Sequence, residues 1–163
     1  MEENEGYSYS VLQKDLQRLK EKYEFLEFGN IGYSVLGRPI SYIRLGIGPN
    51  EVMYSAAFHA NEWITSLVLM KFVEEYAEKY NQNGFIYEYN VRELFNKSSI
   101  HIIPMVNPDG VDLVTGAIPL NTGIYNQFKD ISLNFPSIPF PDGWKANFNG
   151  VEFTNLHFFI LKK

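Results

Sequence analysis

The chain has 163 residues, no cysteine and a formal net charge of -5. This is the size of one domain, and the apolar content is that of a globular protein. The negative charge argues against a nucleic-acid partner, and no apolar run reaches the ~20 residues of a membrane helix. The acidic start, residues 1–5, is unlike a secretory signal, so we expect a cytoplasmic protein with residues 1–7 disordered.

Up to residue 106 the chain alternates helical and strand-like patterns. The hairpin signal Leu36-Gly37-Arg38-Pro39 joins the first two strands, and Asn107-Pro108-Asp109-Gly110 reads as a turn. Such alternation predicts an α/β fold with a mixed, mostly parallel sheet and helices on both faces. The expected helices are 8–23, 63–80 and 91–96, and the expected strands are 25–35, 40–45, 51–58 and 99–106.

Residues 116–150 differ from the rest of the chain. They are rich in proline and glycine, and no periodic pattern of any length is evident in them. We therefore expect a long loop region here, which is usually functional when it occurs inside a domain.

A possible metal site lies in Phe58-His59-Ala60-Asn61-Glu62-Trp63, between an apolar strand and an amphipathic helix. Ligands gather at the carboxyl ends of strands in open α/β sheets, and His59 and Glu62 both carry zinc donors. His-x-x-Glu is a weak signal alone, and a capping glutamate beside a packed histidine explains it equally well. His101 is expected to be a structural strand residue. His157 could be a third ligand, although an apolar C-terminal tail is the simpler reading.

Several strings taken together are more specific. Residues 57–63, 104–110 and 144–147 with Gly150-Val151 occur in the order seen in zinc carboxypeptidases of the carboxypeptidase A type, and Gly37-Arg38-Pro39-Ile40 resembles that family's G-R-x-I turn. The match resembles most closely the bacterial gamma-D-glutamyl-L-diamino acid endopeptidases, which cut peptidoglycan stem peptides. It spans about residues 8 to 151, so residues 1–163 are expected to form one partial catalytic domain.

This resemblance implies a peptidase in which zinc is held by His59, Glu62 and a later histidine. The family's third ligand and general-base glutamate would lie beyond Lys163, and no arginine follows Arg92. Lys145 is the nearby cation that could bind substrate. The implied cofactor is therefore zinc, the implied partner is a cell-wall peptide, and no catalytic residue is assigned.

Residues 152–163 do not resemble the family, which usually reads G-V-D-L-N where this chain reads Gly150-Val151-Glu152-Phe153-Thr154. We interpret this tail as the product of a frameshift and expect the chain alone to be inactive. Resequencing the locus would test this interpretation. The alternatives are a non-catalytic module that binds a peptide or partner, and an oligomer in which a neighbour's His157 completes the site.

Overall fold

The computed structural model describes residues 6–152. Residues 1–5 of the segment expected to be disordered, and the tail from 153 onward with His157, lie outside the described part. The helices are α1 (Tyr9–Lys22), α2 (Ile64–Asn81), α3 (Val91–Lys97), α4 (Pro108–Val114) and α5 (Gly123–Ser132), with a 3-10 turn η1 (Ala60–Glu62). The strands are β1 (Glu27–Tyr33), β2 (Pro39–Leu45), β3 (Asn50–Ser55), β4 (Phe85–Ile86), β5 (Tyr89–Asn90) and β6 (Ser98–Ile103).

Four strands form the main sheet in the order β1-β2-β6-β3. The pairs β1–β2 and β2–β6 are antiparallel, and only β3–β6 is parallel. The sheet is therefore mixed, as expected, but the expectation that it would be mostly parallel was wrong. A short turn can join only antiparallel strands, which fixes β1 against β2, whereas α2 and α3 provide the long crossover that lets β3 and β6 run in parallel.

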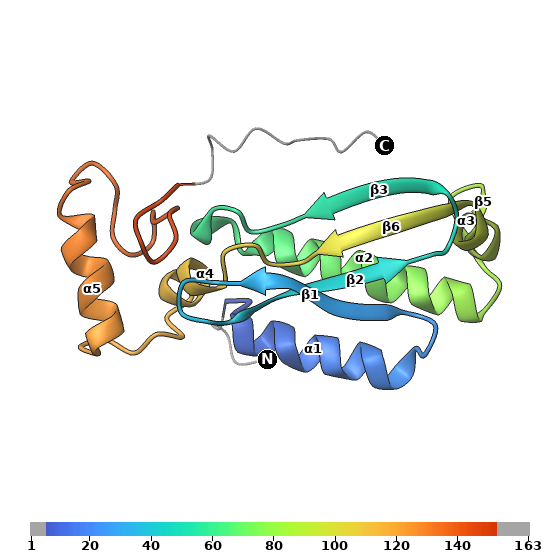
Figure 1. The fold of residues 1–163 in the computed structure, drawn as a ribbon, viewed down its shortest axis with the longest axis horizontal. Coiled ribbons are helices and arrows are strands. Elements are labelled where there is room, and N and C mark those ends of the chain that lie inside the picture. Colours follow the sequence, from blue (N-terminus) through green and yellow to red (C-terminus); the bar gives the residue numbers. More distant parts are fainter. Residues whose placement is uncertain (1–5, 153–163) are drawn as a thin grey trace.

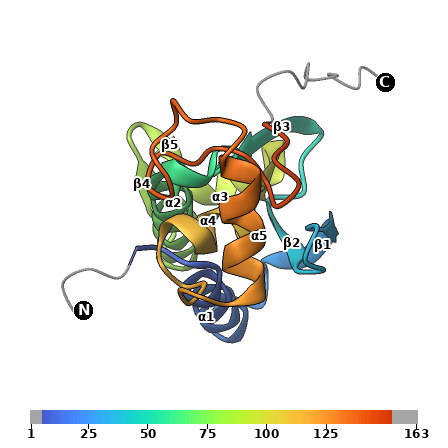
Figure 2. The same ribbon diagram turned by 90° about the vertical axis from the view of Figure 1, so that its left-hand side faces the viewer.

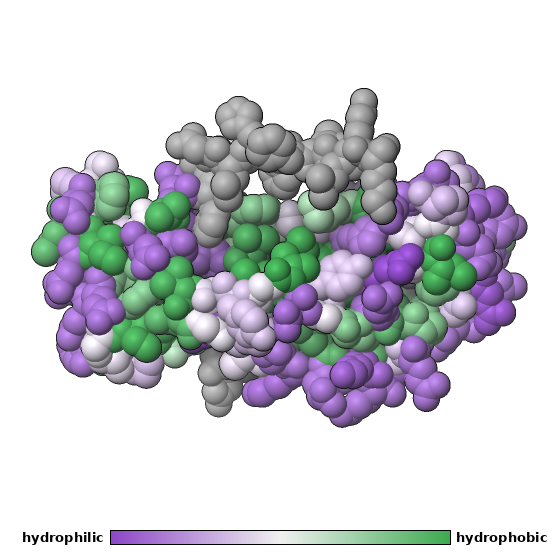
Figure 3. Space-filling view, in the orientation of Figure 1, coloured by the Kyte–Doolittle hydropathy of each residue, from purple (hydrophilic) through white to green (hydrophobic). Residues whose placement is uncertain are grey.

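Helices α1 and α2 lie side by side on one face of this sheet (Figures 1 and 2). Within residues 6–152 no helix lies on the opposite face, where green hydrophobic side chains alternate with purple polar ones (Figure 3). The described part therefore does not show the predicted helices on both faces. No helix among these residues has the length and apolar character that a membrane span requires.

The main hydrophobic cluster fills the space between the sheet and the two helices. α1 contributes leucines at helical spacing, and alternate residues of β2 and β6 point at them because strand side chains alternate between faces. This amphipathic patterning explains why the first half of the chain was predictable. The fully buried members include Leu12, Leu19, Ile43, Leu45, Val73 and Ile102.

A second hydrophobic cluster is built around Trp144, whose side chain is buried. The ring of Phe128, from α5, meets the Trp144 ring edge-on at 6.4 Å between centroids. α5 contradicts the expectation of no regular element in residues 116–150. Thr122 caps this helix through the Tyr125 backbone N–H, and the apolar residues Ile124, Tyr125, Phe128 and Ile131 recur at helical spacing, a signal obscured by the flanking prolines and glycines.

Candidate metal centre

The candidate site lies where the parallel strands β3 and β6 end. Their following segments stay paired, because the Val106 N–H donates to the Ala56 carbonyl and the Asn107 N–H donates to the Ala57 carbonyl, both at 3.0 Å. Ala57 has a left-handed backbone with φ of 48°, which turns the chain out of the sheet just before His59. Since carboxyl ends of parallel strands share one edge, the segments of His59 and Asn107 lie together.

His59 and Glu62 face each other across the short η1 turn. The His59 Nδ1 atom lies 3.0 Å from Glu62 Oε1. Glu62 thus contacts the imidazole through a hydrogen bond. Two ligands each about 2.0–2.1 Å from a tetrahedral zinc are roughly 3.3 Å apart. At 3.0 Å the two side chains are hydrogen-bonded, and both are of the donor types that would hold a zinc ion after little displacement.

The other imidazole nitrogen, His59 Nε2, is buried and makes no hydrogen bond. Among the described residues, the Glu152 carboxylate faces it, with Oε1 at 3.8 Å. Within residues 6–152 no three histidine or carboxylate side chains come together as a metal-binding group. His101 lies elsewhere, on β6, where its Nδ1 atom hydrogen-bonds the Tyr42 hydroxyl at 2.7 Å, as expected for a structural residue.

Asn107 joins the His59 segment to the segment that carries Lys145. Its buried amide donates to the carbonyls of Phe58 (3.4 Å), Lys145 (3.3 Å) and Ala146 (3.1 Å). Its Oδ1 atom accepts from the Gly110 N–H at 3.1 Å and so caps α4. The segment Asn107-Pro108-Asp109-Gly110 is therefore the start of a helix, and the expected turn was a wrong interpretation. Asn at the cap and Pro at the first helical position are the signals that favour a helix start.

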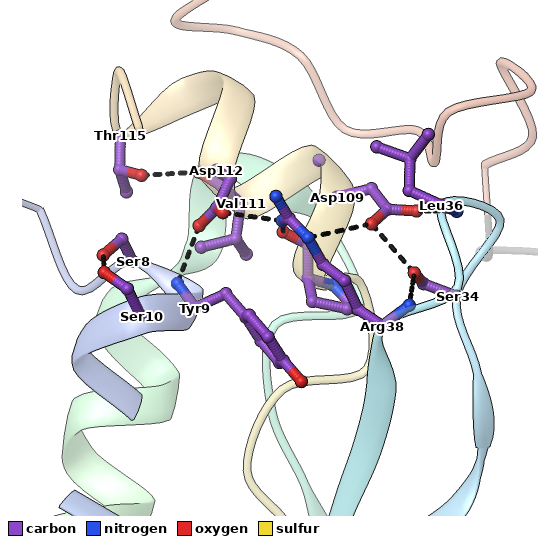
Figure 4. Close-up of polar contacts among 12 residues, drawn as sticks. Ser8, Tyr9, Ser10, Ser34, Leu36, Arg38, Asp109, Val111, Asp112 and Thr115 are labelled. Carbon is purple, nitrogen blue, oxygen red and sulfur yellow. Dashed lines mark hydrogen bonds and ion pairs between the residues drawn. The ribbon is translucent and has the colours of Figure 1, made fainter. Parts of the chain in front are cut away.

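The first turn of α4 is anchored by Arg38, from the turn between β1 and β2 (Figure 4). The Arg38 Nη1 atom lies 2.6 Å from Asp112 Oδ2 and donates to the Pro108 carbonyl at 3.1 Å. Asp109 is 1 % exposed and accepts from Ser34 Oγ at 2.8 Å and from the Leu36 N–H at 3.0 Å. One cation and two buried carboxylates thus fix the hairpin against α4.

Asp112 extends this network to α1. Its Oδ1 atom accepts from the Tyr9 N–H at 2.7 Å, at the start of that helix (Figure 4). Burial raises the pKa of Asp112, while the hydrogen bond from Tyr9 and the charge of Arg38 act in the opposite direction. This role was not predicted, because Arg38, Asp109 and Asp112 come together only in the folded chain.

Gly110 lets α4 pack closely against η1. A Cβ atom at this position would lie 2.7 Å from the Ala60 Cβ atom and 2.7 Å from the Ala146 carbonyl oxygen. Such distances are well inside normal van der Waals contact, so only glycine fits without displacement. α4 therefore supports the backbone beneath His59.

Lys145 lies beside the His59 segment through backbone contacts. Its carbonyl accepts from the Ala60 N–H at 3.1 Å, and the neighbouring Trp144 carbonyl accepts from the Asn61 N–H at the same distance. The Lys145 side chain is exposed, and with Trp144 and Glu152 it lines a small pocket. The structure thus places all three sequence-predicted site residues in one region. It brings only His59 and Glu62 into direct contact.

The described residues thus form a mixed α/β sheet with a histidine–glutamate pair just after the end of β3. Among solved structures, thrombin-activatable fibrinolysis inhibitor matches with a TM-score of 0.62 over 87% of this chain and 30% of its own, at 20% identity. This likeness shows the fold alone.

The chain belongs to the zinc carboxypeptidase family, peptidase M14, whose model matches residues 12–152. It is 40% identical over 148 residues to gamma-D-glutamyl-L-diamino acid endopeptidase 1 of Lysinibacillus sphaericus, covering 91% of this chain and 37% of the relative. It is 34% identical over 154 residues to the uncharacterized protein YqgT of Bacillus subtilis, covering 93% and 40%. The family resemblance is thus confirmed, and the chain spans about two fifths of these relatives' length.

Proposed function

We propose that this chain carries part of a zinc peptidase centre that acts on bacterial cell-wall peptides, with His59 and Glu62 as two of the metal ligands. The observation that carries the proposal is the 3.0 Å separation of His59 Nδ1 and Glu62 Oε1 at the end of β3. Family membership supports the metal, because His and carboxylate donors are normal zinc ligands.

Bound zinc would supply a Lewis acid for the scissile carbonyl and lower the pKa of a water molecule. The residues of this chain would hold the metal and orient its ligands. η1 keeps the imidazole and carboxylate on one side, and the bonds from Asn107 fix the backbone that precedes them. Lys145 is exposed beside this segment, where its ammonium group can attract a substrate carboxylate as a point charge.

The substrate class rests on the 40% identical relative, whose name describes cleavage between gamma-D-glutamate and an L-diamino acid. A peptide of that kind carries free carboxylates, which suits a site with a lysine at its rim. Catalytic zinc sites use three protein ligands, and the described residues provide two. We therefore propose that the chain alone binds peptide and hydrolyses it slowly or not at all, which makes peptide binding without catalysis the second candidate function.

Titration of the purified chain with zinc, followed by calorimetry, tests the metal site. We expect one ion to bind per chain, and we expect His59→Ala to abolish the binding heat because one of two donors is lost. Glu62→Gln should weaken binding, since an amide oxygen lacks the carboxylate charge.

His101→Ala is the matched control. His101 also has a carboxylate within 4.0 Å, because its Nε2 atom lies 3.8 Å from Glu51 Oε1, yet it lies away from η1. Its replacement should leave the zinc isotherm unchanged. Zinc binding that survives His59→Ala, or that is lost in His101→Ala, would place the metal elsewhere and contradict the proposal.

A further inference from the structure

The loop that carries the two candidate ligands, residues 57–62, is closed by the hydroxyl group of Thr65 in the first turn of α2. The Thr65 Oγ1 atom accepts a hydrogen bond from the Ala57 N–H at 2.9 Å. The same oxygen donates to the Glu62 carbonyl at 2.7 Å. One side chain thus connects the segment that follows β3 to the backbone of Glu62, across the stretch that contains His59.

Ala57 is a residue whose conformation needs such support. Its left-handed backbone, with φ of 48°, is unfavourable for a residue with a Cβ atom and persists only where neighbouring contacts hold it. Its N–H is held by Thr65, and its carbonyl accepts from the Asn107 N–H at 3.0 Å. Ala57 is 2% exposed, so an N–H deprived of the hydroxyl would have little access to water. The turn of the chain toward His59 therefore depends on Thr65.

The second bond of the hydroxyl acts on the other candidate ligand. A threonine hydroxyl on a helix can bond the carbonyl three residues earlier, and the branched Cβ atom restricts the side chain to few rotamers. Here that carbonyl belongs to Glu62, whose Oε1 atom lies 3.0 Å from His59 Nδ1. A shift of this backbone would move the carboxylate relative to the imidazole. Thr65 therefore influences both members of the pair through their backbone.

We propose that Thr65 is a positioning residue of the metal centre, which sets the separation of the His59 and Glu62 donor atoms before a metal binds. The inference rests on the proposed function for the identity of the ligands. The hydroxyl proton and one lone pair of Thr65 are used within the loop, so the residue acts through the backbone and not as a ligand. Ligands that are already in place lose less conformational freedom on binding, and this raises the affinity for the metal.

Thr65→Val tests the proposal, because valine keeps the size and branching of threonine but lacks the hydroxyl. Thr65 is exposed, so the substitution creates no packing conflict in the core. We expect the zinc dissociation constant to rise about tenfold, the lower end of the effect of losing support around metal ligands. Thr65→Ser retains a hydroxyl and should restore the affinity. Thr115→Val is the matched control, since the Thr115 hydroxyl donates to the Val111 carbonyl at 2.8 Å at the end of α4, outside the loop.

Hydrogen exchange of the metal-free chain gives a second measurement that does not require zinc. We expect the Ala57 amide to exchange about tenfold faster in Thr65→Val, while the amides of β6 keep their protection, and to return to its original rate in Thr65→Ser. Unchanged exchange at Ala57, or equal acceleration in β6, overturns the proposal.

The zinc titration can also overturn it. If Thr65→Val binds zinc as tightly as the unchanged chain, or if Thr115→Val loses as much affinity, Thr65 does not position the ligands. A chain that binds no zinc in any form would contradict the proposed function instead. The exchange rate of the Ala57 amide would then still decide whether the Thr65 hydroxyl holds the loop.

Discussion

Replacing Asp109 by alanine is expected to lower the free energy of unfolding by about 3–5 kcal/mol, the usual cost of removing one partner from a buried charge network. The carboxylate is 1 % exposed and accepts hydrogen bonds from Ser34 Oγ and the Leu36 N–H. Without it, both part-buried donors lose their acceptor, and the Arg38 guanidinium keeps only Asp112 as a carboxylate partner. Urea denaturation followed by circular dichroism measures the change.

Asp130→Ala is the matched control for this experiment. Asp130 is an exposed residue of α5, so its removal should change stability by no more than about 0.5 kcal/mol. If Asp109→Ala lowers the free energy of unfolding no more than the control does, the carboxylate does not hold the hairpin against α4. The contacts in Figure 4 would then not anchor the hairpin.

The second large effect is expected at Asn107, where serine separates the two roles of the side chain. A serine hydroxyl can still cap the Gly110 N–H, but it cannot reach the carbonyls of Phe58, Lys145 and Ala146. The Lys145 carbonyl keeps the Ala60 N–H as a donor, but the buried Ala146 carbonyl loses the Asn107 amide. An unsatisfied buried acceptor costs about 1–3 kcal/mol, so Asn107→Ser should destabilise the chain by about that amount. Zinc affinity should fall roughly tenfold or more, as it does when support around metal ligands is lost.

Asn107→Ala shows how much of the effect is due to the cap, since alanine removes both roles. Hydrogen exchange measures whether the Asn107 amide holds the His59 segment in place. In the serine variant, the amides of residues 58–63 should exchange faster while those of α4 keep their protection. Equal acceleration in both segments would mean that the variant simply unfolds, and unchanged exchange at residues 58–63 would show that the amide does not position the His59 segment.

Sequence patterns predicted the elements of the first half well because each has a local cause. The leucines of α1 recur at helical spacing, and the turn at Gly37 has a left-handed φ of 78° that glycine adopts without strain. The direction of the sheet was harder to predict. It depends on β2 pairing with β6, a contact between distant segments that no local pattern specifies.

The candidate site also has a part that the sequence predicts and a part that depends on folding. His59 and Glu62 are three residues apart, so a local motif and the family resemblance suffice to find them, and the structure brings their side chains together. Their role as ligands remains a prediction. The supporting residues Arg38, Asp109 and Asn107 also lie in motifs of the family, but their mutual contacts arise from folding. Glycine and proline in the motifs suggested turns, and the buried charge network was therefore missed.

The position of His59 between the two hydrophobic clusters has a consequence for how the centre moves. Ala57 belongs to the sheet cluster and Ala60 to the Trp144 cluster, so the imidazole is attached to both by a few backbone bonds. The backbone N–H groups of Ala60 and Asn61 donate hydrogen bonds to the Lys145 and Trp144 carbonyls. Any rearrangement of the cluster around Trp144 that separates residues 144 and 145 from η1 would break these bonds even with the sheet intact. The pairing of His59 with Glu62 therefore depends on the packing of Trp144 as well as on the sheet.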